Sequence, residues 1–301
     1  MPTTSAAPPS RRNRYMTRRS TLATSCLRRR HSQHGQKRPF LPVETASVAW
    51  RPVLVLLPPS ETKHPGGDGA PLDLTVLTTP ELTPLRAELA DALVELAADV
   101  PAARTALGLS PAQDDEITRN ARLRISPTLP AVQRYTGVLY DALDVASMTR
   151  AQRARADRRL AIGSALFGVV RAGDPIPPYR LSAGSTLPGR PTLRTFWKPA
   201  LTDVLTGIDE LVVDLRSGSY AALAPVPGAV TVRVLSEHSD GSRTVVSHFN
   251  KAHKGRLARL LATTTAEPDG VLRLRALLRR AGLHVEHDGD RTLTLVIPAE
   301  H

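Results

Sequence analysis

The sequence has few cysteine and aromatic residues. Cys26 is the single cysteine among 301 residues, so the chain has no disulfide framework and no cysteine-based metal site. Aromatic residues make up only 4% of the chain, so Leu, Val and Ala must fill a core. No apolar run approaches the roughly 18 residues of a membrane helix. We therefore expect a soluble protein with no membrane partner, and the lack of cysteine suits a cytoplasmic location.

Familiar motifs of cofactor and metal chemistry are also missing. The chain contains no G-x-x-x-x-G-K phosphate loop, no G-x-G-x-x-G dinucleotide fingerprint and no G-x-S-x-G nucleophile elbow. The nine histidines include no H-E-x-x-H pair, and His248 and His253 are five residues apart. The sequence therefore predicts no metal site and no cofactor.

The net charge of +12 is unevenly distributed along the chain. Residues 1–50 hold ten Arg and Lys residues and one acid, Glu44, whereas residues 51–301 hold 30 basic and 27 acidic residues. The overall charge is therefore weak evidence that the part after residue 50 binds nucleic acid. Arginine outnumbers lysine 35 to 5, which suggests that each of the few lysines meets a local requirement.

The first 50 residues have the composition of a disordered basic extension. They are rich in Pro, Ser, Thr and Arg and show no apolar periodicity, so they bury too little apolar surface to offset the chain entropy. A transit peptide, a phosphate-binding arm and upstream sequence translated from a start codon assigned too early all explain them. We favour the third explanation, because the first strand pattern begins directly afterwards, at Val53.

The rest of the chain alternates between strand and helix patterns. Apolar runs predict buried strands at 53–57, 161–170 and 211–215, and 230–235 pairs with 243–248 as a hairpin. Helical spacing or composition predicts the helices 84–96, 111–122, 130–144, 150–159, 192–207, 250–264 and 270–281. This pattern is typical of an α/β or mixed α+β fold with a central mixed sheet flanked by helices. We expect one domain over 51–301, in which 265–301 forms a helix-strand-strand tail.

Polar residues follow two of the predicted strands. Ser60 and Lys63 lie after the first strand, where ligands gather in α/β folds, and their hydroxyl and ammonium groups suit a phosphate. The alternative is an ordinary turn with a helix-capping hydroxyl. Asp214 lies near the carboxyl end of the 211–215 strand and is a candidate general base or orienting group. Its alternative is a structural ion pair.

A proline-rich segment, 173–178, is bracketed by Arg171 on one side and by Tyr179 and Arg180 on the other. Prolines restrict the backbone, so the segment holds these side chains rigidly, which suits recognition of a phosphate or a planar group. The alternative is that the two arginines pair with carboxylates such as Asp174.

The densest basic stretch after residue 50 is the predicted helix 250–264. Lys251 and Lys254 are three residues apart and share one edge of the helix, and Arg256 and Arg259 share another. Four cations on one helix suit salt-sensitive phosphate binding. The alternative is a solvated helix face.

Several segments, in this order along the chain, resemble the YaaA family of bacterial peroxide-stress proteins. They are LVLLPPSETK (54–63), YTGVLYDAL (135–143), SALFGVVRAGDPIPPYRL (164–181), Phe196-Trp197, VVDLRSGSY (212–220) and VSHFNKAHKGRLAR (246–259). The chain resembles an actinobacterial member with an amino-terminal extension. The resemblance implies a single mixed α/β domain, double-stranded DNA binding and resistance to hydrogen peroxide by limiting free iron. Many relatives read Ser-Pro-Ala-Lys-Thr where this chain has Pro59-Ser60-Glu61-Thr62-Lys63, so the role of that loop does not transfer directly.

Two functions remain open at this point. The first is a cytoplasmic DNA-binding stress protein, in which the cations of 250–264 and the loop 171–180 form one groove on double-stranded DNA. The second is an enzyme that acts on a phosphate-bearing or nucleobase small molecule in a polar pocket formed by the loops after the strands. An enclosed pocket favours the enzyme, and an open basic groove as wide as a duplex favours DNA.

The position of the natural amino terminus is directly testable. We expect the product to start near Val53, a residue that a GTG start codon would explain. Mass spectrometry of the endogenous protein should then yield no peptides from residues 11–38, whereas recovery of such peptides would show that the extension is translated.

Overall fold

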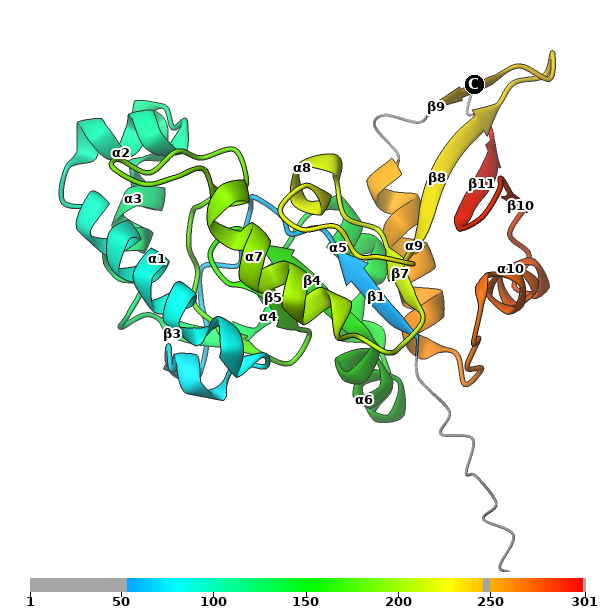
Figure 1. Cartoon of the computed structure of the whole chain (residues 1–301), viewed down its shortest axis with the longest axis horizontal. Helices are drawn as coiled ribbons and strands as arrows, with labels where there is room; N and C mark the ends of the chain where they lie inside the picture. The colour runs from blue at the N-terminus through cyan, green and yellow to red at the C-terminus, as the bar shows by residue number, and fades with distance from the viewer. Residues whose placement is uncertain (1–52, 246–249, 300–301) are drawn as a thin grey trace, which may run out of the picture. The chain divides into compact units, whose positions relative to one another are not determined.

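The computed structural model of the chain describes residues 53–245 and 250–299 (Figure 1). These residues belong to one compact unit. The expected disordered extension, Cys26 and the last residues of the expected 243–248 strand lie outside the described residues.

A mixed sheet forms the centre of the molecule. Its strands run in the order β10-β11-β8-β7-β1-β4-β5, and β9 pairs with the end of β8. Their bounds are β1 Leu54–Leu57, β4 Leu160–Ser164, β5 Gly168–Arg171, β7 Val212–Asp214, β8 Val230–Glu237, β9 Arg243–Val245, β10 Val285–His287 and β11 Thr292–Pro298. Every residue of β1 is buried, as expected for a central strand covered on both faces. The predicted fold class is confirmed.

β1 has parallel neighbours on both sides. Val55 is in register with Leu160 of β4 and with Val213 of β7. The chain thus leaves β1 toward β4 and later returns to the opposite side as β7. Such a reversal of strand order leaves a crevice at the carboxyl ends of the strands, where α/β proteins bind ligands.

The expected strand at 161–170 is wrong, because the chain turns back within it. β4 and β5 form an antiparallel pair in which Ser164 is in register with Gly168. Gly168 has a φ of 72°, and a Cβ atom there would come within 3.0 Å of the Trp197 ring. The chain therefore bends at Gly168, where the positive φ and the close Trp197 ring favour glycine, and the continuous strand is interrupted there.

A second, smaller sheet lies outside the segments predicted as strands. It consists of β2 (Gly69–Pro71), β3 (Pro127–Pro130) and β6 (Pro175–Ile176), in the order β2-β3-β6. The buried guanidinium of Arg134 donates hydrogen bonds to the carbonyl oxygens of Ile176 at 3.0 Å, Pro127 at 3.0 Å and Gly66 at 2.6 Å. One buried side chain thus connects β3, β6 and the loop at Gly66.

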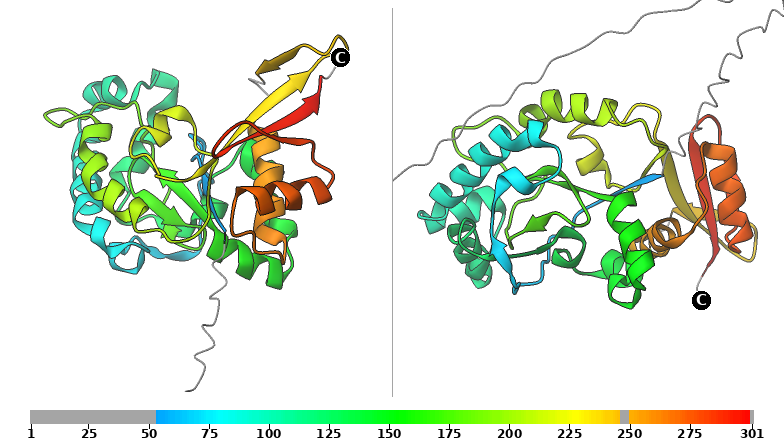
Figure 2. Two further views of the ribbon diagram at one scale, coloured as in Figure 1. Left: turned by 45° about the vertical axis from the view of Figure 1, so that its right-hand side comes forward. Right: turned by 90° about the horizontal axis from the view of Figure 1, so that it is seen from below.

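Helices cover the sheet. They are α1 Thr83–Leu96, α2 Val100–Leu107, α3 Asp114–Ala121, α4 Ala131–Arg134, α5 Val138–Leu143, α6 Arg150–Arg159, α7 Leu193–Thr206, α8 Gly218–Ala221, α9 Asn250–Thr263 and α10 Val271–Arg280. α9 and α6 pack against β1, and α7 packs against β5 and crosses in front of it in Figure 1. α10 packs against β10 at the edge of the sheet (Figure 2). The expected helix 130–144 is broken at Gly137, which has a φ of 97°.

The helices α5 and α9 approach each other closely at Gly255. A Cβ atom at this position would overlap with the carbonyl oxygen of Leu139 and lie 2.8 Å from Cβ of Ala142. Glycine is therefore required here, although it lowers the intrinsic stability of a helix.

We predict that Gly255→Ala lowers the free energy of unfolding by about 1–3 kcal/mol, the usual cost of overpacking. In an open helix the same change would stabilise by up to about 1 kcal/mol. Urea unfolding measures the difference, with Gly184→Ala as the matched control because nothing lies within 4 Å of a Cβ atom there. A Gly255→Ala variant as stable as the parent would show that the two helices are not in such close contact.

Candidate functional site

A pocket of about 760 Å³ lies at the carboxyl ends of β1 and β7. Residues 58–62 after β1 and residues 215–220 after β7 form two of its walls, residues 136–140 form a third, and Asn250, Lys251 and Lys254 of α9 complete it. We call this cavity the β1–β7 pocket. It occupies the crevice at the reversal of strand order.

Hydroxyl groups line one part of the β1–β7 pocket. Ser60 Oγ lies 3.1 Å from Thr62 Oγ1, which accepts a hydrogen bond from Thr136 Oγ1 at 3.1 Å. Ser217 Oγ and Ser219 Oγ are 3.3 Å apart in the wall that follows β7. These groups donate or accept hydrogen bonds, so they suit a polar ligand with several oxygen atoms.

Two ammonium groups and an apolar wall complete the lining. Lys251 is exposed, and Lys254 Nζ donates a hydrogen bond to the carbonyl oxygen of Leu215 at 3.1 Å. Partial burial lowers the pKa of Lys254, and the nearby carboxylate of Asp214 opposes that shift. The apolar wall includes Val138, which is 52% exposed. The pocket therefore combines a side lined by ammonium and hydroxyl groups with an apolar surface.

Lys63 is buried directly behind the wall formed by Ser60 and Glu61. The residue is 7% exposed, and its Nζ donates hydrogen bonds to the carbonyl oxygens of Ser60 at 3.1 Å and Glu61 at 3.2 Å. The same ammonium lies 4.2 Å from the centroid of the Tyr179 ring, which attracts a cation to its face. Burial lowers the pKa of Lys63 to about 7, so the charged and neutral forms are both populated at neutral pH.

Four of the five tyrosines of the chain gather around Lys63 and the pocket. Tyr179 Oη is 2.8 Å from Tyr135 Oη and 2.8 Å from Ser164 Oγ, and the Tyr135 ring stacks on the Tyr140 ring at 5.5 Å. Tyr140 and Tyr220 line the pocket itself. Burial raises the pKa of Tyr135 to about 12 and that of Tyr179 well above 10, so both remain neutral phenols. No sequence motif marks Tyr135, Tyr140 or Ser164 as site residues, and the scarcity of tyrosine is the one signal that points to the first two.

Asp214 forms the structural ion pair that the sequence left open. Arg216 Nε donates to Asp214 Oδ1 at 3.0 Å and Arg216 Nη2 donates to Oδ2 at 2.8 Å. Arg216 also donates to the carbonyl oxygen of Ala224 at 3.0 Å. The carboxylate therefore holds Arg216 and the chain after β7 in place.

The arginines of the 171–180 segment are separated. Arg180 forms an ion pair with Glu61 at 2.7 Å, beside the β1–β7 pocket. Arg171 lies at the end of β5, donates to the carbonyl oxygen of Arg158 at 2.9 Å and lies 3.7 Å from Glu210. Arg171 does not line the pocket, and Tyr179 lies in the core beneath it.

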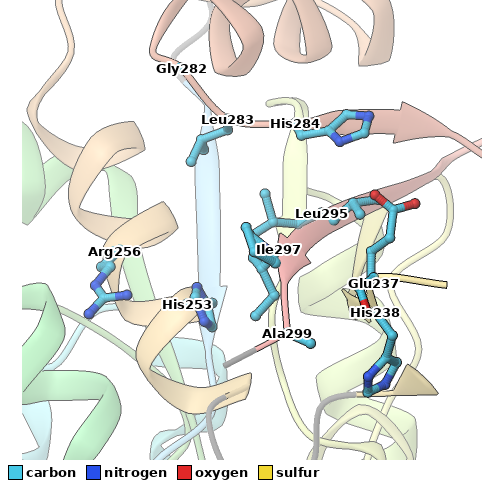
Figure 3. A pocket seen from close by; sticks show the side chains of 13 residues that line it. Glu237, His238, His253, Arg256, Gly282, Leu283, His284, Leu295, Ile297 and Ala299 are labelled. Carbon is cyan, nitrogen blue, oxygen red and sulfur yellow. The ribbon is translucent and has the colours of Figure 1, made fainter. Parts of the chain in front are cut away.

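The cations of α9 divide between different surroundings. Arg259 donates hydrogen bonds to the carbonyl oxygen of Leu143 at 2.8 Å and to Ser147 Oγ at 2.7 Å. Arg256 lines a second cavity of about 830 Å³, together with His253 and residues of β11 (Figure 3). Only Lys251 and Lys254, of the four cations singled out on this helix, line the β1–β7 pocket.

The described part of the chain has no candidate metal site and no candidate membrane span. No group of three or more His, Asp or Glu residues there has the geometry to hold a metal ion. Likewise, none of the described helices is long and apolar enough to cross a membrane.

The geometry defines the class of this protein. It is a mixed α/β protein with a polar pocket at the point where the strand order reverses. Residues 53–288 match the family model described as "Peroxide stress protein YaaA". The chain belongs to this family, which confirms the resemblance of its sequence motifs.

The relatives include actinobacterial proteins. A UPF0246 protein of Corynebacterium efficiens is 54% identical over 251 residues, which cover 81% of this chain and 100% of the relative. A UPF0246 protein of Streptomyces coelicolor is 47% identical over 242 residues, or 78% of this chain and 92% of the relative. A more distant UPF0246 protein, from Flavobacterium johnsoniae, is 32% identical over 147 residues, or 46% of this chain and 58% of the relative.

The state of Lys63 predicts a particular dependence of stability on pH. Its pKa is about 7 in the folded chain and 10.5 in the unfolded chain, so between these values the unfolded chain binds more protons. The stability of the parent should therefore rise with pH, by about 2 kcal/mol between pH 7 and pH 9. Lys63→Met lacks this titration.

Urea unfolding of the parent and of Lys63→Met at pH 7, 8 and 9 measures this difference. The stability of the parent relative to the variant should increase across the range. Parallel curves would show that Lys63 keeps an ordinary pKa in the folded protein.

Proposed function

We propose that this YaaA-family chain binds a phosphate-bearing small molecule of nucleotide size in the β1–β7 pocket and acts on it as an enzyme. One observation carries the proposal. Hydroxyl groups from the loops after β1 and β7 line the same cavity as Lys251 and Lys254 of α9. Ammonium and hydroxyl groups are the donors that hold phosphate oxygens.

The apolar wall supports a ligand that carries more than a phosphate. Val138 and Tyr220 line the same cavity as the two lysines, and a planar nucleobase buries apolar area against such side chains. A cavity of about 760 Å³ is also within the range of small-molecule sites.

Lys63 and Ser60 have different roles in this proposal. The pKa of Lys63 is near 7, but the residue lies behind the wall and does not line the pocket, so it sets the charge beside the ligand rather than transferring a proton to it. Ser60 places a hydroxyl in the pocket, where it can position a phosphate oxygen or act as a nucleophile.

Double-stranded DNA is a second candidate ligand, in the response to hydrogen peroxide and in limiting damage from free iron. One observation favours it: Lys251 and Arg256 are both exposed on α9, and neither forms an ion pair with any residue described in the structure. Against it, Arg180 and Arg259 are engaged by neighbouring groups, and Arg171 lies away from α9 on β5. The geometry therefore favours the small molecule.

Binding measurements with matched variants test both candidates. We expect Lys251→Ala/Lys254→Ala to weaken the binding of nucleoside monophosphates at least tenfold, whereas Lys198→Ala, on the exposed surface of α7, leaves it unchanged. Isothermal titration calorimetry across the common nucleotides measures the affinity. If no nucleotide binds to the parent, or if the double variant binds as well as the parent, the pocket proposal fails.

Fluorescence anisotropy with duplex DNA forms the second arm. It should use both the full chain and a chain that starts at Val53, because the basic extension would bind DNA regardless of the pocket. If DNA is the ligand, the shorter chain binds it, and the double variant reduces the salt slope by about 2. If only the full chain binds, the signal belongs to the extension.

A further inference from the structure

The ammonium of Lys63 has no counter-ion among the described residues. Its hydrogen-bond acceptors are carbonyl oxygens, and its third contact is an aromatic ring. Glu61 is paired with Arg180 at 2.7 Å, and Glu116 is paired with Arg119 at 2.6 Å. A buried charge is normally compensated by an opposite charge. In the free protein, the protonated form of Lys63 lacks such a partner among the described residues.

The surroundings of Lys63 contain more cations than anions. The charged and titratable groups that face it or the adjoining pocket are Glu61, Glu116, Arg119, Tyr135, Tyr140, Tyr179, Arg180, Asp214, Arg216, Tyr220, Lys251 and Lys254. Each of the three carboxylates is paired with an arginine, and burial keeps the tyrosines neutral. Lys63, Lys251 and Lys254 are therefore three ammonium groups with no carboxylate partner in the described chain.

We propose that the ligand of the β1–β7 pocket is a phosphate monoester, whose dianion is the counter-ion that Lys63 lacks, and that Lys63 takes up a proton when this ligand binds. The inference rests on the proposed function, because it assumes that phosphate occupies the pocket. A phosphate monoester carries close to two negative charges above neutral pH, since its second pKa is about 6. A phosphodiester, such as a DNA backbone phosphate, carries only one.

The coupling does not need direct contact between Lys63 and the phosphate. Nζ is bonded to the carbonyl oxygens of Ser60 and Glu61, and both residues line the pocket. A dianion held on the other side of this wall attracts the ammonium, and because Lys63 is buried this attraction is stronger than it would be in water. The ligand thus stabilises the charged form of Lys63, and by linkage the charged form binds the ligand more tightly.

Methyl phosphate and dimethyl phosphate are suitable probes, because they differ in charge and carry no base. Isothermal titration calorimetry of the full chain at pH 8, in two buffers of different ionisation enthalpy, measures the affinity and the protons taken up. We expect methyl phosphate to bind with uptake of about half to one proton and to lose roughly three- to tenfold in affinity from pH 8 to pH 9. Dimethyl phosphate should bind at least tenfold more weakly than methyl phosphate.

Substitutions of lysine locate the proton. Lys63→Met should bind methyl phosphate without proton uptake and with an affinity that does not change between pH 8 and pH 9. Lys63→Arg should bind it without uptake at both pH values, because a guanidinium group is always charged. Lys254→Met should bind more weakly but keep the uptake, and Lys198→Met, on the exposed face of α7, should match the parent.

The outcomes separate this inference from the proposed function. Binding of methyl phosphate with no proton uptake, or with uptake that persists in Lys63→Met and Lys63→Arg, would overturn the role of Lys63 and leave the phosphate pocket standing. Uptake that disappears in Lys254→Met instead would also overturn it. If the parent binds neither methyl phosphate nor nucleotides, the proposed function fails and this inference fails with it.

Discussion

A buried ammonium group determines how the site is built. Lys63 Nζ is held by the carbonyl oxygens of Ser60 and Glu61 and by the face of the Tyr179 ring. These contacts fix the loop after β1, so they also fix the hydroxyl groups that the loop presents to the pocket. The backbone of Lys63 forms an isolated bridge with Tyr135, which ties the loop to the segment before α5. Two walls of the β1–β7 pocket therefore depend on one lysine.

Buried arginines hold the irregular parts of the rest of the fold. Arg86, Arg134, Arg159 and Arg216 each donate hydrogen bonds to carbonyl oxygens of loops or strand ends, often far away in sequence. Hydrogen bonds from charged donors contribute about 1.5–3 kcal/mol each, and a carbonyl group left without a partner in the core would cost a similar amount. A chain with few aromatic residues and a single cysteine relies on such links to order its long loops.

The sequence predicts local structure well here and distant partners poorly. The strand before Ser60 and the helix that carries Lys251 follow from runs and spacing of apolar residues, and the structure confirms both. The bend at Gly168 depends on packing against Trp197, which comes from a distant helix, so no local pattern shows it.

The sequence identifies several residues of the candidate site but not the partners that these residues have in the fold. Ser60, Lys251 and Lys254 line one pocket, with Lys63 behind its wall, whereas the sequence grouped the cations of 250–264 with the 171–180 segment. The engagement of Arg259 by the carbonyl group of Leu143 could not be predicted, because the two residues are 116 positions apart. Likewise, the grouping of the tyrosines brings together three separate segments of the chain, and only the folded chain shows it.

The titration of Lys63 tests this account most directly. The chain contains five lysines, so ¹³C-lysine labelling gives few signals to follow by NMR, and Lys63→Arg assigns the relevant one. The account predicts that one Cε signal titrates near pH 7 in the free protein and shifts to a higher pH when a phosphate monoester is added. A Lys63 signal that titrates near 10.5 with and without phosphate would contradict it, because the ammonium would then need no further counter-ion.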